Sequence, residues 1–83
     1  MPLRILLFTQ AGCLSCELMK IFLEAKEIVF EERDMNLDST ARMELLEIYR
    51  THTAPAIVIL KGTAFEVIEG FDPARLDRCL SAA

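Results

Sequence analysis

The segment 3–26, LRILLFTQAGCLSCELMKIFLEAK, decides the fold because the periodicity of its apolar residues changes within it. Residues 3–9 form a nearly continuous apolar run, which is typical of a strand covered on both faces. From about Cys13 to Lys26, apolar residues recur at helical spacing, and charged residues occupy the opposite side. The apolar side comprises Cys16, Met19 and Leu23, with Leu18 and Phe22 beside them. The segment therefore predicts a strand followed directly by a helix, with two cysteines at the start of the helix.

The rest of the pattern predicts five further elements. In chain order they are a strand at 28–30 that fades into the charged segment 31–34, a helix from Asp38 or Ser39 to about Arg50, strands at 56–60 and 64–69, and a short helix that begins at Asp72-Pro73. A strand, a helix and a strand in succession require a parallel pair with a right-handed crossover. The turn at 61–63 predicts an antiparallel hairpin. The order β-α-β-α-β-β-α therefore predicts an α/β, three-layer sandwich of thioredoxin-like topology with a four-stranded mixed sheet.

Length, charge and cysteine content narrow the classes of function. The 83 residues suffice for one domain, spanning 1–83, and carry a net charge of −4. That charge disfavours nucleic acid and anionic membranes as partners, because both require a basic face. No apolar run approaches the roughly 18 residues of a membrane span, and one of the three cysteines must remain unpaired. We therefore expect a monomer in a reducing compartment, the cytoplasm.

The strongest functional signal is the motif CLSC at residues 13–16. Three helical steps leave the two cysteine side chains roughly 60° apart around the helix axis, so a disulfide can join them. Cys13 falls on the side of Glu17 and Lys20, whereas Cys16 falls on the apolar side. This asymmetry suits thiol–disulfide exchange, in which an exposed thiolate attacks a disulfide and a shielded thiol resolves the mixed disulfide.

The position of Cys13 at the start of a helix also favours ionisation of its thiol. Free backbone N–H groups and the positive end of the helix dipole favour a thiolate there. No charged residue occurs between Thr9 and Cys16, and Lys20 is two turns away.

Two other interpretations of the CLSC motif remain open at this point. The motif could be half of a zinc site, although zinc usually needs four ligands, or the two cysteines could have no joint function.

A second signal is Pro55, directly before the strand predicted at 56–60. A proline that simply begins a strand is the ordinary interpretation. The functional alternative is a cis peptide bond between Ala54 and Pro55, which would present the Ala54 backbone to an extended peptide. Such bonds are cis in about 5–6% of cases in folded proteins. Position alone does not decide between these interpretations.

In the order and spacing of three motifs, the chain resembles the glutaredoxin family of the thioredoxin-like superfamily. The motifs are the strand and C-x-x-C of residues 8–16, the triplet Thr53-Ala54-Pro55, and the turn Gly70-Phe71-Asp72-Pro73. The resemblance implies a thiol–disulfide oxidoreductase. It also implies Cys13 as the nucleophile, Cys16 as the resolving thiol and Pro55 as a cis-proline beside them.

Within this family, the chain is most similar to the small redoxins that donate electrons to ribonucleotide reductase. Those redoxins usually accept electrons from thioredoxin reductase rather than from glutathione. Gln10 stands where glutaredoxins commonly carry the Lys or Arg that helps bind a glutathione carboxylate, and Glu69 replaces the first glycine of their Gly-Gly pair. Leu14-Ser15 replaces Pro-Tyr, and the redoxin tryptophan is missing. The charge of Glu69 disfavours an anionic tripeptide such as glutathione.

We therefore expect a dithiol oxidoreductase in which Cys13 attacks a disulfide and Cys16 resolves it. An outside reductant, either thioredoxin reductase or glutathione, restores the dithiol. No tightly bound cofactor is expected, because the thiol pair itself carries the electrons. Protein disulfides are the expected substrates because the predicted docking surface is mostly apolar. That surface comprises Ala11, Leu14, Thr53, Ala54, Gly70 and Phe71.

Two rival functions would use the same motif differently. The first is a metal or iron–sulfur binding module that uses the cysteine thiolates. Its soft-metal chaperone version has a ferredoxin-like fold, which places a hairpin rather than a helix at about 38–50. The second rival is an adaptor without redox chemistry, for which Cys13→Ser would leave cellular function untouched.

Several other residues have simpler interpretations. Cys79 lies on the apolar stripe of the last helix, and free cysteine is among the most buried residue types, so a packing role is expected. His52 is expected in a solvent-exposed loop, and the segment 31–34 as a solvated strand end. The residues expected in the core include Ala41, Leu45 and Ile48, together with Tyr49 and the phenylalanines at 8, 22, 30 and 65.

Overall fold

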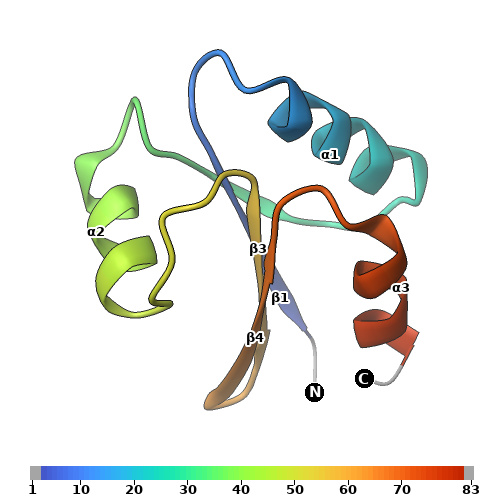
Figure 1. Ribbon diagram of the computed structural model, residues 1–83. Helices are drawn as coiled ribbons and strands as arrows, with labels where there is room; N and C mark the ends of the chain where they lie inside the picture. The colour runs from blue at the N-terminus through green and yellow to red at the C-terminus, as the bar shows by residue number, and fades with distance from the viewer. Residues whose placement is uncertain (1–2, 82–83) are drawn as a thin grey trace.

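The computed structural model describes residues 3–81, so the ends of the domain predicted over 1–83 lie outside the described part. In chain order the elements are β1 (Arg4–Thr9), α1 (Leu14–Ala25), β2 (Glu31–Asp34), α2 (Ser39–Glu47), β3 (Ala56–Lys61), β4 (Ala64–Glu69) and α3 (Pro73–Ser81). Figure 1 shows their arrangement. The order is the predicted one. Because 39–47 is helical, the hairpin of a ferredoxin-like metal chaperone does not occur there.

The strands form one mixed sheet in the order β2-β1-β3-β4. β1 runs parallel to β2 and antiparallel to β3, and β3 and β4 form an antiparallel hairpin. Helices α1 and α3 cover one face of the sheet, and α2 covers the other (Figure 1). The predicted α/β, three-layer sandwich with a four-stranded mixed sheet is therefore confirmed.

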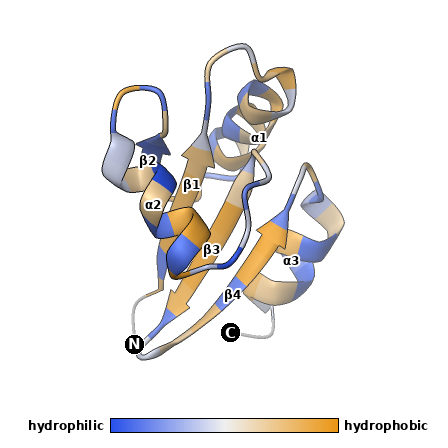
Figure 2. Ribbon diagram, turned by 60° about the vertical axis from the view of Figure 1, so that its left-hand side comes forward, coloured by the Kyte–Doolittle hydropathy of each residue, from blue (hydrophilic) through white to orange (hydrophobic). Residues whose placement is uncertain are grey.

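Strand β1 supplies side chains to both apolar layers, because successive residues of a strand point to opposite faces. Ile5 and Leu7 pack with residues of α1 and α3, whereas Leu6 and Phe8 pack with residues of α2. Figure 2 shows the hydrophobic character of both central strands, β1 and β3. A strand buried on both faces explains why its sequence is nearly all apolar.

The prediction of the second strand at 28–30 is wrong, because β2 lies at Glu31–Asp34. After α1, the chain turns back through Glu27, which has φ 58°, and the amide of Ile28 donates to the carbonyl of Leu23 at 2.9 Å. Ile28 and Phe30 then pack against the layer of α1 and α3. These two residues cover the margin of the core, whereas Val29 between them is exposed. The charged residues form the strand because β2 is an edge, where side chains can remain in solvent.

The prediction that the second helix extends to about Arg50 is also wrong, because α2 ends at Glu47. Arg50 adopts φ 60°, and the amide of Thr51 donates to the carbonyl of Leu45 at 3.1 Å. A left-handed residue just beyond a helix is a common way to end it. Ile48 is consequently exposed rather than buried, while Leu45 is buried as expected.

The aromatic residues only partly follow the prediction of a buried cluster. Phe8 is fully buried, but Phe65 is exposed on the outer hairpin, and Phe22 and Phe30 are half-buried. Tyr49 lies between Phe8 and Phe65, with ring centroids 5.8 Å and 4.9 Å away. The three rings therefore form a row of contacts from the core to the surface on the α2 side of the sheet.

Replacing Leu7 by alanine tests the two-sided burial of β1. Because Leu7 is fully buried, Leu7→Ala should lower the free energy of unfolding by about 3 kcal/mol through lost burial and a residual cavity. Urea denaturation measures the change. The matched control Leu46→Ala lies on α2, where Leu46 is 46% exposed, and should change stability by less than about 0.5 kcal/mol. Equal losses at the two positions would contradict this packing.

Candidate active site

Gly12 and Cys13 turn the chain from β1 into α1. Gly12 has φ +71°, a conformation that glycine adopts without steric cost. Cys13 is extended and caps the helix: the amide N–H of Cys16 donates to Cys13 Sγ at 3.1 Å. Helix caps are usually side-chain oxygens, and here a sulfur takes that role. The Cys13 sulfur therefore lies at the positive end of the helix dipole.

Cys13 and Cys16 are joined by a disulfide, and their Cα atoms are 5.2 Å apart. Cys13 is half-buried, whereas Cys16 is only 1% exposed. This is the asymmetry that the helical spacing predicts. An incoming disulfide can approach Cys13, while Cys16 lies beneath it, enclosed by the protein.

Three segments that are distant in sequence meet at the end of β1 that leads to the cysteines. In the register of the sheet, Ala56 pairs with Phe8 on one side and with Glu69 on the other. Residues before Ala56 and after Glu69 therefore extend toward the same end of the sheet (Figure 1). The amide of Gly70 donates to the carbonyl of Pro55 at 2.8 Å and fastens these two segments together.

The peptide bond between Ala54 and Pro55 is cis, which is the functional alternative considered from the sequence. Pro55 is fully buried, and Ala54 is half-buried just before it. The backbone of Ala54 thus comes to the surface at the end of the sheet where the cysteines lie.

The residues of the predicted docking surface all lie at this end of the sheet, but they differ in exposure. Leu14 is 73% exposed. Ala11 and Phe71 are also exposed, whereas Thr53 and Gly70 are half-buried. Leu14 therefore presents an exposed apolar side chain next to the cysteine pair.

Sequence reasoning missed the contribution of the loop after β2. Asn36 Oδ1 accepts a hydrogen bond from the amide of Ala11 at 2.5 Å and so ties this loop to the loop before Cys13. The neighbouring Leu37 is 87% exposed and adds apolar surface beside the predicted set. Asp34 Oδ1 shapes the loop by accepting from the amide of Asn36 at 2.8 Å. The two loops are 25 residues apart, so no local pattern could have indicated this contact.

Sequence reasoning also missed a cluster around Glu69. Its carboxylate accepts hydrogen bonds from the hydroxyls of Thr51 and Thr53, the latter at 3.3 Å. The Thr51 hydroxyl in turn accepts from the amide of Thr53 at 3.2 Å. The hydrogen bond from Thr51 is the main cause that lowers the pKa of Glu69, so its carboxyl is charged at neutral pH. The cluster attaches the segment before Pro55 to the end of β4.

Lys20, the charged residue two turns from Cys13 on α1, is engaged with carboxylates. Its Nζ lies 3.3 Å from Glu17 and 3.3 Å from Glu32, and Glu32 also accepts a hydrogen bond from the Thr9 hydroxyl at 2.8 Å. The hydrogen bond to Glu17 is the main cause that raises the pKa of Lys20. The feature that favours ionisation of the Cys13 thiol is therefore the helix terminus rather than this ammonium group.

Cys79 and His52 do not join the site. Cys79 is half-buried on α3, and its Sγ lies 2.9 Å from Glu66 Oε2. The hydrogen bond to Glu66, with a contribution from burial, raises the pKa of Cys79, so its thiol is protonated at neutral pH. His52 is exposed in the loop between α2 and β3, as expected.

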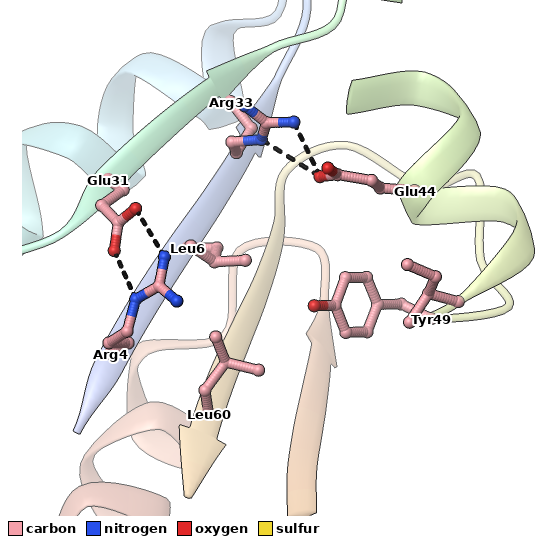
Figure 3. A pocket seen from close by; sticks show the side chains of 8 residues that line it. Arg4, Leu6, Glu31, Arg33, Glu44, Tyr49 and Leu60 are labelled. Atoms are coloured by element: carbon pink, nitrogen blue, oxygen red, sulfur yellow. Dashed lines mark hydrogen bonds and ion pairs between the residues drawn. The ribbon is translucent and has the colours of Figure 1, made fainter. Parts of the chain in front are cut away.

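A cavity of about 280 Å³ lies between α2 and the sheet, away from the cysteines. Its lining includes Arg4 and Leu60, which pair at the end of the sheet opposite the disulfide. Figure 3 shows two ion pairs there, Arg4 with Glu31 at 2.9 Å and Arg33 with Glu44 at 2.8 Å. Because these four charged side chains are already paired, the described lining of the cavity has no unpaired charge that could take part in a thiol–disulfide reaction.

Residues 3–81 offer neither a metal site nor a membrane-spanning helix. No group of three or more His, Cys, Asp or Glu side chains in this range is arranged to hold a metal ion. Within the same range, no helix is sufficiently long and apolar to cross a membrane. The cysteine pair is thus the centre of the candidate site.

Comparisons with protein families and with solved structures agree on the fold of the chain. The family model for glutaredoxins matches residues 5–65, whereas no curated protein matches the chain. Among solved structures, the thioredoxin-like protein BC3987 is 33% identical with a TM-score of 0.80, and the match covers 90% of this chain and 97% of that one. The likeness therefore extends over nearly the whole of both chains.

Two more distant structures share the fold. The glutaredoxin-like protein NrdH-redoxin from Escherichia coli is 24% identical with a TM-score of 0.70, covering 90% of this chain and 92% of that one. The glutaredoxin from Archaeoglobus fulgidus is 16% identical with a TM-score of 0.75, covering 93% and 85%. The fold is thioredoxin-like, and the cysteine pair within it supports a general role in thiol–disulfide redox chemistry. The chain belongs to the glutaredoxin family.

Proposed function

We propose that this protein is a thiol–disulfide oxidoreductase that reduces disulfides of other proteins through the Cys13–Cys16 dithiol. One observation carries the proposal: the two cysteines form a disulfide at a helix N-terminus, with Cys13 half-buried and Cys16 enclosed. Membership of the glutaredoxin family supports the same class of reaction.

The first step is attack by the Cys13 thiolate on one sulfur of a substrate disulfide. A new bond forms between Cys13 Sγ and that sulfur, the substrate S–S bond breaks, and the second substrate sulfur leaves as a thiolate that takes up a proton. The amide of Cys16, which donates to Cys13 Sγ at 3.1 Å in the oxidised protein, favours the thiolate over the thiol because it donates to the charged form.

The second step resolves the mixed disulfide. The Cys16 thiol loses its proton and attacks Cys13 Sγ, so that the Cys13–Cys16 disulfide forms and the substrate leaves with its second thiol. Two electrons have then passed from the protein to the substrate. The Cα separation of 5.2 Å between the cysteines lies within the range of ordinary disulfides, so no movement of the backbone is required.

Thioredoxin reductase or glutathione is the proposed source of electrons that restores the dithiol, and no bound cofactor takes part. Gln10 and Glu69 disfavour glutathione, since neither provides a positive charge for its carboxylates. The related NrdH-redoxin is described as having a thioredoxin-like activity profile, which supports the reductase as the donor. A dithiol of this kind works in a reducing compartment, for which we propose the cytoplasm.

Single serine variants test the two cysteine roles. Cys13→Ser should abolish reduction of a protein disulfide such as that of insulin, because the attacking sulfur is lost. Cys16→Ser should instead accumulate a mixed disulfide between Cys13 and the substrate, visible by mass spectrometry of the intact adduct. Cys79→Ser is the matched control and should retain the wild-type rate, since Cys79 lies on α3 outside the site. A mixed disulfide between Cys79 and the substrate would refute the roles assigned to Cys13 and Cys16.

A redox titration separates this function from the metal-binding alternative. In graded dithiol buffers, alkylation and peptide mass spectrometry should report reversible formation of the Cys13–Cys16 disulfide, with a potential of roughly −200 to −300 mV, as in cytosolic carriers. Metal analysis of the purified protein accompanies the titration. Cysteines that resist alkylation because iron or zinc is bound would favour the metal module instead.

A further inference from the structure

Glu69 places a fixed charge at the edge of the docking surface. It is the last residue of β4, directly before Gly70-Phe71, and its carboxylate is held by the hydroxyls of Thr51 and Thr53. Thr51 is only 7% exposed, so this end of the cluster is anchored in the protein, while Glu69 itself is exposed. The charge is therefore both accessible to a partner and restricted in position.

The charges around Glu69 leave this side of the surface negative. Arg75 on α3 is near enough to lower the pKa of Glu69, as is His52, but no ion pair joins either to Glu69 within residues 3–81. Asp72, two residues beyond Gly70, caps α3 by accepting from the amide of Arg75 at 3.1 Å. Among the described residues, Arg75 is thus the one permanently charged cation that lowers the pKa of Glu69, and it forms no ion pair with that carboxylate.

The opposite side of the cysteine pair is also acidic. Lys20 lies 3.3 Å from both Glu17 and Glu32, so one positive charge is shared by two negative charges. Asp34, at the end of β2, adds a further carboxylate whose hydrogen bonds hold the loop carrying Leu37. The exposed apolar side chains Leu14, Leu37 and Phe71 therefore lie between two acidic margins.

From this arrangement we propose that Glu69 is a specificity-determining residue, which selects disulfide partners that carry positive charge beside the disulfide and rejects partners that carry negative charge there. The proposal rests on the proposed oxidoreductase function. Its physical basis is charge complementarity at the rim of a contact, which changes the rate of productive encounter more than the strength of binding. The partner is thus a protein segment in which basic residues flank an accessible disulfide.

Three synthetic peptides with the same intramolecular disulfide test the proposal. They differ only in the residues on each side of the disulfide, which are lysine, glutamine or glutamate. The measured quantity is the second-order rate constant for reduction of each peptide by the reduced protein. The proteins compared are the wild type, Glu69→Gln and the control Glu24→Gln, since Glu24 is exposed near the far end of α1.

The wild type should reduce the lysine peptide about fourfold faster than the glutamate peptide at low ionic strength. A unit charge about 8 Å away changes each rate about twofold in opposite directions in water. Glu69→Gln should lower this preference below about twofold, because the amide keeps a hydrogen-bond acceptor but loses the charge. Glu24→Gln should keep the full preference, and about 1 M salt should remove it from every protein.

The glutamine peptide separates selectivity from structural damage. Because the neutral peptide does not respond to the charge of Glu69, its rate in each protein is the reference to which the rates of the two charged peptides are normalised. An unchanged preference in Glu69→Gln, or an equal loss of rate on all three peptides, would overturn the role of Glu69. A wild type that reduces no peptide would instead refute the oxidoreductase function itself.

Discussion

The position of β1 between β2 and β3 is the constraint on which the site depends. β1 is hydrogen-bonded on both edges and packed on both faces, so its end is fixed relative to every other element. The turn through Gly12 then delivers Cys13 to the N-terminus of α1. The same register aligns Ala56 with both Phe8 and Glu69. A shift of one residue would turn the alternating side chains over and separate these segments.

Two hydrogen-bonded clusters then hold the loops around the cysteine pair in place. Asn36 holds the loop before Cys13, and Glu69 holds the segment before Pro55 through Thr51 and Thr53. Both clusters use polar side chains of loops and strand ends, so the apolar core is not interrupted. The backbone around the cysteine pair is consequently fixed from two directions, which suits the proposed docking of a partner segment in one orientation.

Local patterns in the sequence were sufficient to predict the order of elements, the cysteine pair at the start of α1 and the start of α3 at Asp72-Pro73. They misplaced the second strand because Ile28 and Phe30 pack at the margin of the core outside any strand, while an edge strand can be charged. The Glu69–Thr51 contact joins residues 18 apart, and the Asn36–Ala11 contact joins residues 25 apart. Such contacts depend on strand register and loop path, which no periodicity encodes.

A disulfide carrier needs partners that arrive quickly and also leave. Large apolar contact would slow release, whereas in the proposed mechanism the covalent mixed disulfide holds the partner during the reaction. Exposed apolar side chains such as Leu14 and Leu37 give a contact of limited extent, and charge at its rim raises the rate of encounter without adding a strong bond. The anchored carboxylate of Glu69 fits this requirement better than a mobile one, because its position does not have to be fixed again at each encounter.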